Sequence, residues 1–370
     1  MPTILNSTGF PKTRRPAIYS RVDASALAGG DIESGNIALV GDFASFQNSK
    51  PVQFSSRRSM AAYDQTDNEL ALLAQLGFSP SDDPNTNNGA SSISVVNARE
   101  NCLQASIVVG PLTLTSKIYG PTSNRLNATL AIDGTKHTLT LNRNGLSEIF
   151  EIENEALFNL ACTSGVDLSI TEGTLTLTDT AAQTTLITFD QSEAPTISDA
   201  VTLLNTVNGI TATLSDPTSI KLDEIDEIDT SLAGGANENV LAPAFRLKEA
   251  LNVSNLVTAT LDNSSTAAAL NAINLTNATG GGKGNTFDFD KALTSIENEN
   301  IQIVVLFTDD LSSQSFLAAH LTAAGRAGYE RQAYTAIDST STLTQVKSRA
   351  ASLNNAGIAL ASQSGELIDP

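Results

Sequence analysis

The chain has 370 residues, 41% of them hydrophobic, and a formal net charge of −19 at pH 7. This length allows two or three domains with a sizeable core, and the composition is that of an ordinary globular protein. A surface this acidic repels nucleic acids and anionic membranes, so we expect neither as a partner. The two cysteines, Cys102 and Cys162, are too far apart in sequence to indicate a disulfide framework or a zinc cluster.

The first twenty residues predict an extended N-terminal arm. They contain three prolines around the basic residues Lys12, Arg14 and Arg15, and they show no helical or alternating apolar period. They also lack the apolar core and cleavage site of a signal peptide, and the longest apolar run, residues 303–307, is too short to span a membrane. We therefore expect a soluble protein that is made in a cytoplasm.

Residues 21–104 predict the first part of an α/β domain. A short apolar run at 36–41 ends in glycine and is typical of a buried strand, and residues 93–96 form a second such run. Between them, apolar residues from Met60 to Leu76 recur at helical spacing, and Gly77 ends the pattern. The order strand, helix, strand indicates a parallel sheet.

Residues 105–240 predict an inserted antiparallel β domain. Apolar residues alternate with threonine at 138–141 and at 174–177, and a helix is expected only at 198–205. This segment has a net charge of −13, against −2 for residues 1–104 and −4 for residues 241–370. We interpret the acidic stretch 222–229 as a solvated face, because it lacks the glycine and the ligand spacing of a calcium loop.

Residues 241–370 predict the second part of the α/β domain. Helices are expected at 289–296, around 316–321 and at 343–353, the last capped by Thr340 or Ser341 and ended by residues 354–357. Strands are expected at 301–307 and 358–361. The predicted class is therefore α/β plus β: a discontinuous α/β domain with a mostly parallel sheet (21–104 with 241–370), an insertion (105–240) and a preceding arm (1–20).

No residue is predicted to be catalytic, cofactor-binding or metal-binding, so we expect no enzyme and no cofactor. His137 lies in a threonine-rich strand, where we expect it to face solvent, and His320 lies on a helix; no cluster of ligands or carboxylates accompanies either. The glycine-rich run 280–284 lacks the spacing and the hydroxyl residue of a phosphate-binding loop, which leaves a flexible connection. Carboxylate pairs at 288/290 and 309/310 lie near predicted helix starts.

Several segments, in a fixed order, resemble the contractile tail sheath family of phages and related injection machines. They are RPAIY at 15–19, NIALVG at 36–41, VVNAR at 95–99, YGPTSNR at 119–125 and TGGGKG at 279–284, with YERQAY at 329–334 further on. Sheath proteins usually continue into a further C-terminal domain, which this chain does not show after Pro370. The resemblance implies a subunit that forms stacked hexameric rings around an inner tail tube and contracts to drive that tube through the host envelope.

The same resemblance implies the binding partners of the chain and its location. The partners are other copies of the chain, the inner tail tube protein, and the baseplate and tail terminator proteins; the location is the virion tail, assembled in the host cytoplasm. Arms of neighbouring subunits add strands to one another's sheets in this family. For this chain, Lys12, Arg14 and Arg15 are expected to steer the arm onto an acidic neighbour, where Ile18, Tyr19 and Val22 pack or pair; the alternative is a disordered tail, since proline-rich basic termini are often mobile. The acidic insertion is then expected on the outside of the polymer.

Two other classes of function stay open from the residues alone. The Thr- and Asn-rich β segment is compatible with a surface-binding adhesin or decoration module, which would need exposed aromatic residues there. The insertion has only four aromatic residues, and the chain has no tryptophan. An unrecognised hydrolase is the other alternative, although no serine lies in a nucleophile-elbow motif.

Overall fold

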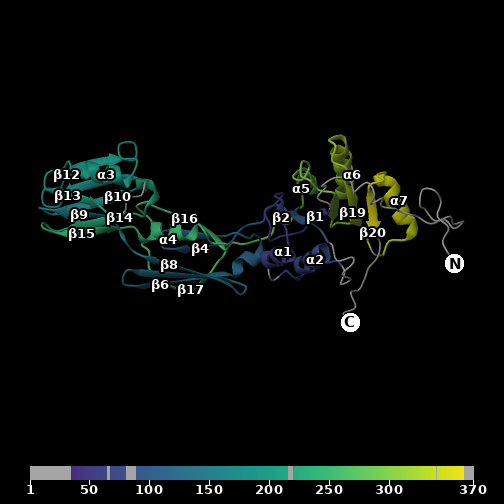
Figure 1. The fold of residues 1–370 in the computed structure, drawn as a ribbon, viewed down its shortest axis with the longest axis horizontal. Coiled ribbons are helices and arrows are strands. Elements are labelled where there is room, and N and C mark those ends of the chain that lie inside the picture. Colours follow the sequence, from purple (N-terminus) through teal and green to yellow (C-terminus); the bar gives the residue numbers. More distant parts are fainter. Residues whose placement is uncertain (1–34, 65–66, 81–88, 216–219, 339, 362–370) are drawn as a thin grey trace.

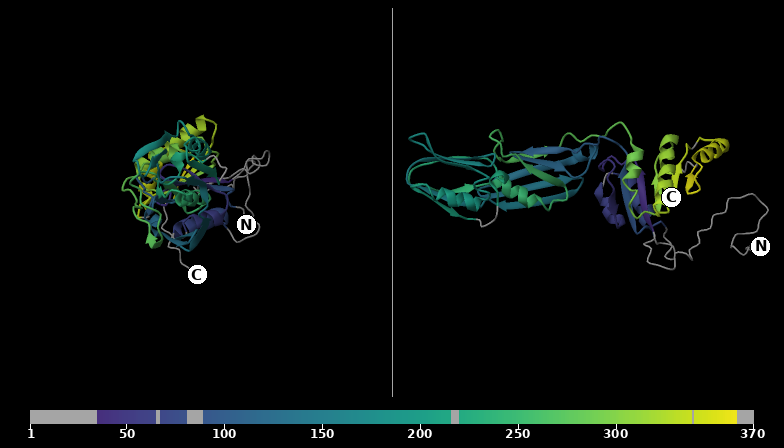
Figure 2. Two further views of the ribbon diagram at one scale, coloured as in Figure 1. Left: turned by 90° about the vertical axis from the view of Figure 1, so that its left-hand side faces the viewer. Right: turned by 90° about the horizontal axis from the view of Figure 1, so that it is seen from above.

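The computed structural model describes residues 35–64, 67–80, 89–215, 220–338 and 340–361. They form an elongated molecule, with a mixed α/β part at one end and antiparallel strands along the rest (Figures 1 and 2). The chain thus has the α/β plus β class that the sequence predicts. None of the helices in the described part of the chain combines the length and the apolar character needed to cross a membrane.

The α/β part, which we call the body, is built on one six-stranded sheet with the order β2-β3-β1-β18-β19-β20. β1 lies between β3 and β18 and is parallel to both, and β19 and β20 continue in parallel. At one edge, β2 runs antiparallel to β3. The strands are β1 (Asn36–Gly41), β2 (Val52–Phe54), β3 (Ser92–Asn97), β18 (Ile303–Leu306), β19 (Gln332–Ala336) and β20 (Ile358–Ala361).

Side chains of β1 contribute to two separate apolar cores, because successive residues of a strand face opposite sides of the sheet. Ala38 and Val40 belong to one core, together with Val304 of β18. Leu39 belongs to the other core, together with Ile93 of β3. The sheet is thus packed on both faces around β1, as expected for a parallel sheet, and its strands come from both ends of the chain.

Two helices, α1 (Arg57–Tyr63) and α2 (Asn68–Phe78), cover one face of this sheet, whereas the sequence predicted a single helix between Met60 and Gly77. The backbone of Asp64 is extended and ends α1. Asp67 then caps α2, because its side chain accepts a hydrogen bond from the backbone of the first turn at 2.9 Å. Two aspartates therefore divide an apolar pattern that looks continuous.

The helices on the opposite face are α5 (Phe289–Thr294), α6 (Leu311–Arg326) and α7 (Leu343–Leu353). The N-cap of α7 is Thr342, not Thr340 or Ser341 as the sequence indicated, and its hydroxyl accepts a hydrogen bond from the N–H of Gln345 at 3.4 Å. Asn354 ends α7 in the left-handed conformation, at φ 42°. An asparagine tolerates that conformation better than most residues, which agrees with the expected stop.

The antiparallel strands nearest the body form a near lobe of two sheets, with the orders β16-β5-β4 and β17-β6-β7-β8, around one apolar core. On β7 the side chains of Leu139 and Leu141 are buried while those of Thr138 and Thr140 are half-buried, as the alternation predicted. The strands are β4 (Ser106–Val109), β5 (Leu112–Ser116), β6 (Leu126–Asp133), β7 (Lys136–Arg143), β8 (Leu146–Glu153), β16 (Val257–Leu261) and β17 (Ile273–Asn277).

A distal lobe contains the other antiparallel sheets, with the orders β12-β11-β10-β14 and β13-β9-β15. The predicted helix is present as α3 (Ile197–Leu204), capped by Thr196 through a capping box. The strands are β9 (Ala156–Cys162), β10 (Val166–Thr171), β11 (Thr174–Asp179), β12 (Thr184–Asp190), β13 (Ile210–Leu214), β14 (Ile228–Leu232) and β15 (Asn237–Leu241).

Residues 243–277 lie with the antiparallel strands, although the sequence placed the return to the α/β domain at residue 241. β16 pairs with β5, and β17 pairs with β6. Helix α4 (Pro243–Leu251) buries Leu247 in the core of the near lobe and Phe245 in that of the distal lobe. We therefore propose that the insertion extends to about residue 278. Alternating threonine and apolar residues at 257–261 carry the signal that would have indicated this.

Candidate assembly site

Neither histidine lies in a reactive cluster, and groups of three or more potential metal ligands are absent from the described ranges. His137 is 5% exposed, so its expected orientation toward solvent is wrong. Its side chain lies on the same inward face of β7 as that of Leu139. The two-residue period of a strand predicts this from their spacing in the sequence. His320 is also buried, and its Nε2 lies 2.7 Å from Nη1 of Arg331. Burial, together with the positive charge of Arg331, lowers the pKa of His320 to about 4.

The acidic stretch 222–229 is only partly solvated. Asp226 is 9% exposed, and its carboxylate accepts hydrogen bonds from the N–H groups of Ala244 and Phe245 in the first turn of α4, at 3.3 and 3.4 Å. Burial raises the pKa of Asp226 against the effect of these bonds. Ile225 is fully buried. The prediction of a solvated face is therefore wrong at four positions: Leu222, Ile225 and Ile228 are buried in the core of the distal lobe, and Asp226 is buried against the start of α4.

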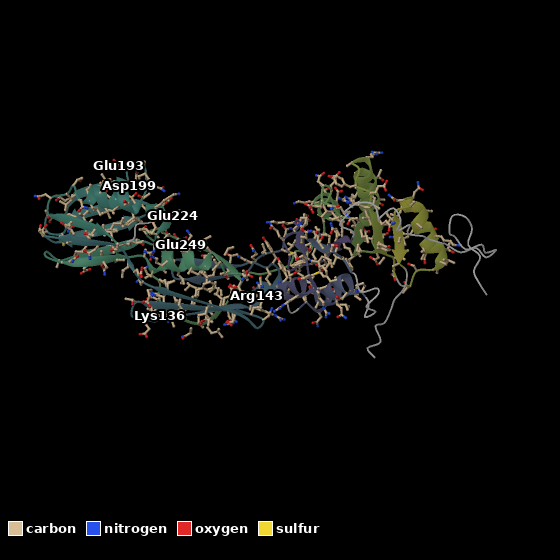
Figure 3. The ribbon with its side chains drawn as sticks, in the orientation of Figure 1. Lys136, Arg143, Glu193, Asp199, Glu224 and Glu249 are labelled. Carbon is tan, nitrogen blue, oxygen red and sulfur yellow. The ribbon has the colours of Figure 1, made fainter. Side chains whose placement is uncertain are left out.

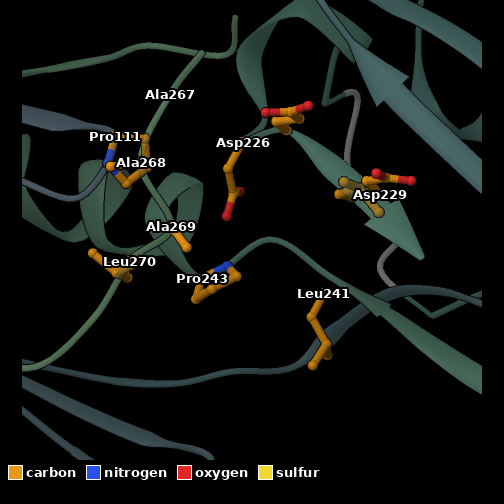
Figure 4. Close-up of a pocket in the computed structure, with 11 residues that line it drawn as sticks. Pro111, Asp226, Asp229, Leu241, Pro243, Ala267, Ala268, Ala269 and Leu270 are labelled. Carbon is orange, nitrogen blue, oxygen red and sulfur yellow. The ribbon is translucent and has the colours of Figure 1, made fainter. Parts of the chain in front are cut away.

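A hollow of about 500 Å³ lies beside this anchor (Figure 4). Figure 4 shows Asp226 pointing into it, opposite Pro243 and the run Ala267–Leu270. The carboxylate of Asp226 is bonded to the start of α4. We therefore interpret the hollow as a gap at the junction of the two lobes and not as a ligand site.

The glycine-rich run 280–284 is held in place by hydrogen bonds, so its interpretation as a flexible connection is wrong. Gly281 donates its N–H to Oδ1 of Asn124 at 2.9 Å and accepts from Nδ2 of Asn124 at 2.8 Å. A Cβ on Gly284 would lie 1.7 Å from the carbonyl oxygen of Glu100, and a Cβ on Gly281 would lie 2.1 Å from Oγ of Ser123. These glycines are therefore required by close packing rather than by mobility.

Two chain segments join the body to the insertion and lie side by side. We call residues 98–105 the outgoing connector and residues 279–288 the return connector. Isolated bridges pair Arg99 with Phe287, Leu103 with Gly282 and Ser106 with Thr279. The 3₁₀ helix η2 (Pro121–Arg125), which carries Ser123 and Asn124, packs against the return connector.

A second hollow, of about 700 Å³, lies at the C-terminal ends of β1 and β18, where the strand order of the body reverses. Ligands of α/β proteins commonly bind at such a point. Here the hollow is lined by Asp42, Asp288, Asp290 and Asp310. Asp288 and Asp310 cap α5 and α6, as predicted for carboxylates near helix starts. Hydrogen bonds from the hydroxyl of Ser312 and from the N–H and hydroxyl of Ser313 lower the pKa of Asp310 to about 2. The carboxylates occupy the N–H groups that would otherwise bind a phosphate.

The sheet of the body ends at β20, which has no further strand beside it in the described part of the chain. One face is also open there. The register aligns Val305, Tyr334 and Ala359 across β18, β19 and β20 on the same side of the sheet. Tyr334 is 45% exposed, and Ala359 and Ala361 are exposed. We call this edge and face the open end of the sheet; it offers unpaired backbone groups and apolar side chains.

The six residues predicted to make arm contacts, Lys12, Arg14, Arg15, Ile18, Tyr19 and Val22, lie outside the described residues. Their interaction with a neighbour stays a prediction. The acidic residues of the insertion are in view: Figure 3 shows Glu193, Asp199 and Glu224 on the distal lobe and Glu249 on α4. Glu193, Asp199 and Glu249 are exposed.

Comparison with known proteins gives matches among solved structures only. No protein-family model matches the chain, and no curated protein matches it. The matching structures include a sheath tail protein from Listeria innocua, with a TM-score of 0.46 and 12% identity over 85% of this chain and 50% of that one. They also include a sheath tail protein from Desulfitobacterium hafniense, with a TM-score of 0.44 and 12% identity over 93% of this chain and 56% of that one. This chain thus spans about half the length of either protein.

Proposed function

We propose that this chain is a structural subunit of a contractile tail sheath. It forms stacked hexameric rings around an inner tail tube, bound at the two ends by baseplate and tail terminator proteins, and contracts to drive the tube through the host envelope during genome delivery. The subunit acts by self-assembly and catalyses no reaction. It is assembled in the host cytoplasm and resides in the virion tail.

The main observation in support of this proposal is that three of the sheath-like segments meet at one place in the fold. The residues VVNAR, YGPTSNR and TGGGKG are far apart in the sequence, yet all three lie at the junction between body and insertion. Asn124 of the second segment bonds Gly281 of the third, and Arg99 of the first bonds the carbonyl of Gly284. Segments that resemble one family in order, and that build one contact in space, support the resemblance better than any of them does alone.

The open end of the sheet supplies a surface for assembly. An arm from a neighbouring subunit can pair its backbone with the free edge of β20, since an added strand satisfies N–H and C=O groups there. In the proposed contact, Lys12, Arg14 and Arg15 are attracted to the acidic neighbour, and Ile18, Tyr19 and Val22 pack at its sheet. The insertion, with its net charge of −13 over residues 105–240, lies on the outside of the polymer, where its charges remain hydrated.

Electron microscopy of concentrated protein tests the proposal. We expect tubes or rings from the full chain, and deletion of residues 1–20 should abolish them while leaving the circular dichroism spectrum of the subunit intact. A matched deletion of residues 363–370 distinguishes loss of the arm from loss of any terminus. A full chain that remains monomeric at all concentrations, with or without an inner tube protein, would contradict the proposal.

The structure gives no support to an adhesin. Of the four aromatic residues within 105–240, Phe158 and Phe189 are buried, and Tyr119 and Phe150 are half-buried. A glycan-binding surface needs exposed aromatic rings, which this segment does not offer.

A further inference from the structure

Arg99 connects three segments of the chain at the junction of body and insertion. It follows β3 at the start of the outgoing connector, and it is 9% exposed. Its Nε donates to Oδ1 of Asp42 at 2.5 Å, and its Nη2 is paired with the other oxygen of the same carboxylate. Nη1 donates to the carbonyl of Gly284 at 2.5 Å, and the guanidinium lies 4.4 Å from the centre of the Phe287 ring. One side chain therefore holds the loop after β1 and the return connector.

The two connectors alone would be a weak mechanical link. They are short extended segments joined by isolated bridges, and a two-stranded ribbon twists easily. The planar fork of an arginine, which makes two bonds to a carboxylate in fixed geometry and stacks on a ring, restrains both the separation and the rotation of the segments it joins.

Other contacts surround Arg99 and share this task. The Asn97 side chain accepts from the N–H groups of Phe43 and Arg99 and donates to the carbonyl of Phe46 at 2.9 Å. Further along, the N–H of Tyr119 in the insertion donates to the carbonyl of Ser45 in the body at 2.9 Å. Arg99 shares one of these bonds, through its backbone N–H to Asn97.

We propose that Arg99 is a positioning residue that fixes the angle between the body and the insertion, so that the two parts move together as one rigid unit. The coupling belongs to the individual subunit and goes beyond the sheath function, so it can be tested without assembly. Loss of Arg99 should leave the chain folded. The reason is that the side chain of Asp42 is 43% exposed, so water can hydrate its carboxylate when Arg99 is replaced. The variant therefore leaves neither charge of this pair buried without a partner.

The test measures the distance between two spin labels, one in each part. Val253→Cys in the near lobe and Leu76→Cys on α2 provide label sites that are 78% and 53% exposed, whereas the native Cys102 and Cys162 are buried. We expect a single narrow distance distribution in the parent protein. Arg99→Ala should broaden it at least about twofold, because the hinge then has only backbone bridges to restrain it.

Two further variants make the result specific. Arg99→Lys keeps the charge but loses the fork and should give an intermediate width. Arg57→Ala removes an exposed arginine of α1 that bonds Gln75, away from the junction, and should leave the distribution unchanged. A folded Arg99→Ala protein with the parent width would overturn the proposal. If Arg99→Ala does not fold, Arg99→Lys and Asp42→Asn carry the same test, and parent widths in both would overturn it.

Discussion

The buried pair of His320 and Arg331 makes the stability of the body depend on pH. Arg331 is 7% exposed at the start of β19, and its Nη2 donates to the carbonyls of Glu297 and Glu299 at 2.9 and 2.7 Å. Its Nη1 points at Nε2 of His320 on α6, so the histidine must stay neutral to accept this bond. Protonation of His320 would place two positive charges side by side in the core and loosen α6 from the sheet.

The size of the effect follows from proton linkage. The ordinary pKa of histidine is 6.5, and His320 in the folded protein has a pKa of about 4. Between these values the unfolded chain binds a proton that the folded chain does not, so this contribution to stability is complete above pH 6.5 and is lost as the pH falls toward 4. Between pH 7 and pH 5 the linkage amounts to at most about 2 kcal/mol, and residual screening by solvent reduces the expected loss to about 1–2 kcal/mol.

Urea denaturation at pH 7 and at pH 5, followed by far-ultraviolet circular dichroism, measures this loss. Carboxylates of the chain titrate in the same range of pH. The test therefore compares the loss of unfolding free energy between pH 7 and pH 5 in the parent with that in His320→Gln, whose neutral amide can still accept a hydrogen bond from Arg331. The variant should lose about 1–2 kcal/mol less than the parent on acidification. An equal dependence in His320→Gln and the parent would refute the reasoning.

Three further predictions concern close packing and helix capping. Gly284→Ala should destabilise the chain by about 2–4 kcal/mol in urea denaturation, because its Cβ overlaps a carbonyl of the outgoing connector, whereas Gly282→Ala, which meets nothing within 4 Å, should be neutral. Asp310→Ala should cost about 1–2 kcal/mol at pH 7 through loss of the α6 cap, and less at pH 2, where about half of this carboxylate is protonated. Asp309→Ala should not destabilise the chain, and equal losses for the two variants at pH 7 would contradict the capping role. Asp226→Asn should change stability by less than about 1 kcal/mol, because an amide oxygen also caps α4, whereas a larger loss would show that the charge matters.

Strands and most helices of this fold could be predicted from local pattern. The period of two at 138–141 and the cap and stop signals around 343–354 are properties of neighbouring residues, and the structure reproduces them with small shifts. His137 and Asp226 show the limit of residue type as a guide to burial. The polarity of His137 predicts an exposed side chain, but its spacing from Leu139 places it on the buried face of β7. The acidic neighbours of Asp226 predict a solvated side chain, but its partners are the N–H groups of α4.

The junction could not have been derived from sequence alone. The bond between Asn124 and Gly281 joins residues 157 positions apart, and that between Arg99 and Gly284 joins residues 185 apart. No local period encodes such pairs. A run of four glycines around a lysine favours mobility when it is considered by itself, and only the neighbouring segments in space show that there is no room for a Cβ at two of these positions.

The central position of β1 has a consequence for how the chain is made. Asn36 at its start bonds Gln302, 266 residues later, so the ribosome completes the whole insertion before β1 gains its second neighbour. Until then the nascent body is half a sheet with one apolar flank exposed, and such intermediates aggregate readily. We expect the lobes to fold first during translation and to bring the two halves of the sheet together. Synthesis of this protein should therefore depend on chaperones that shield the N-terminal strands in the meantime.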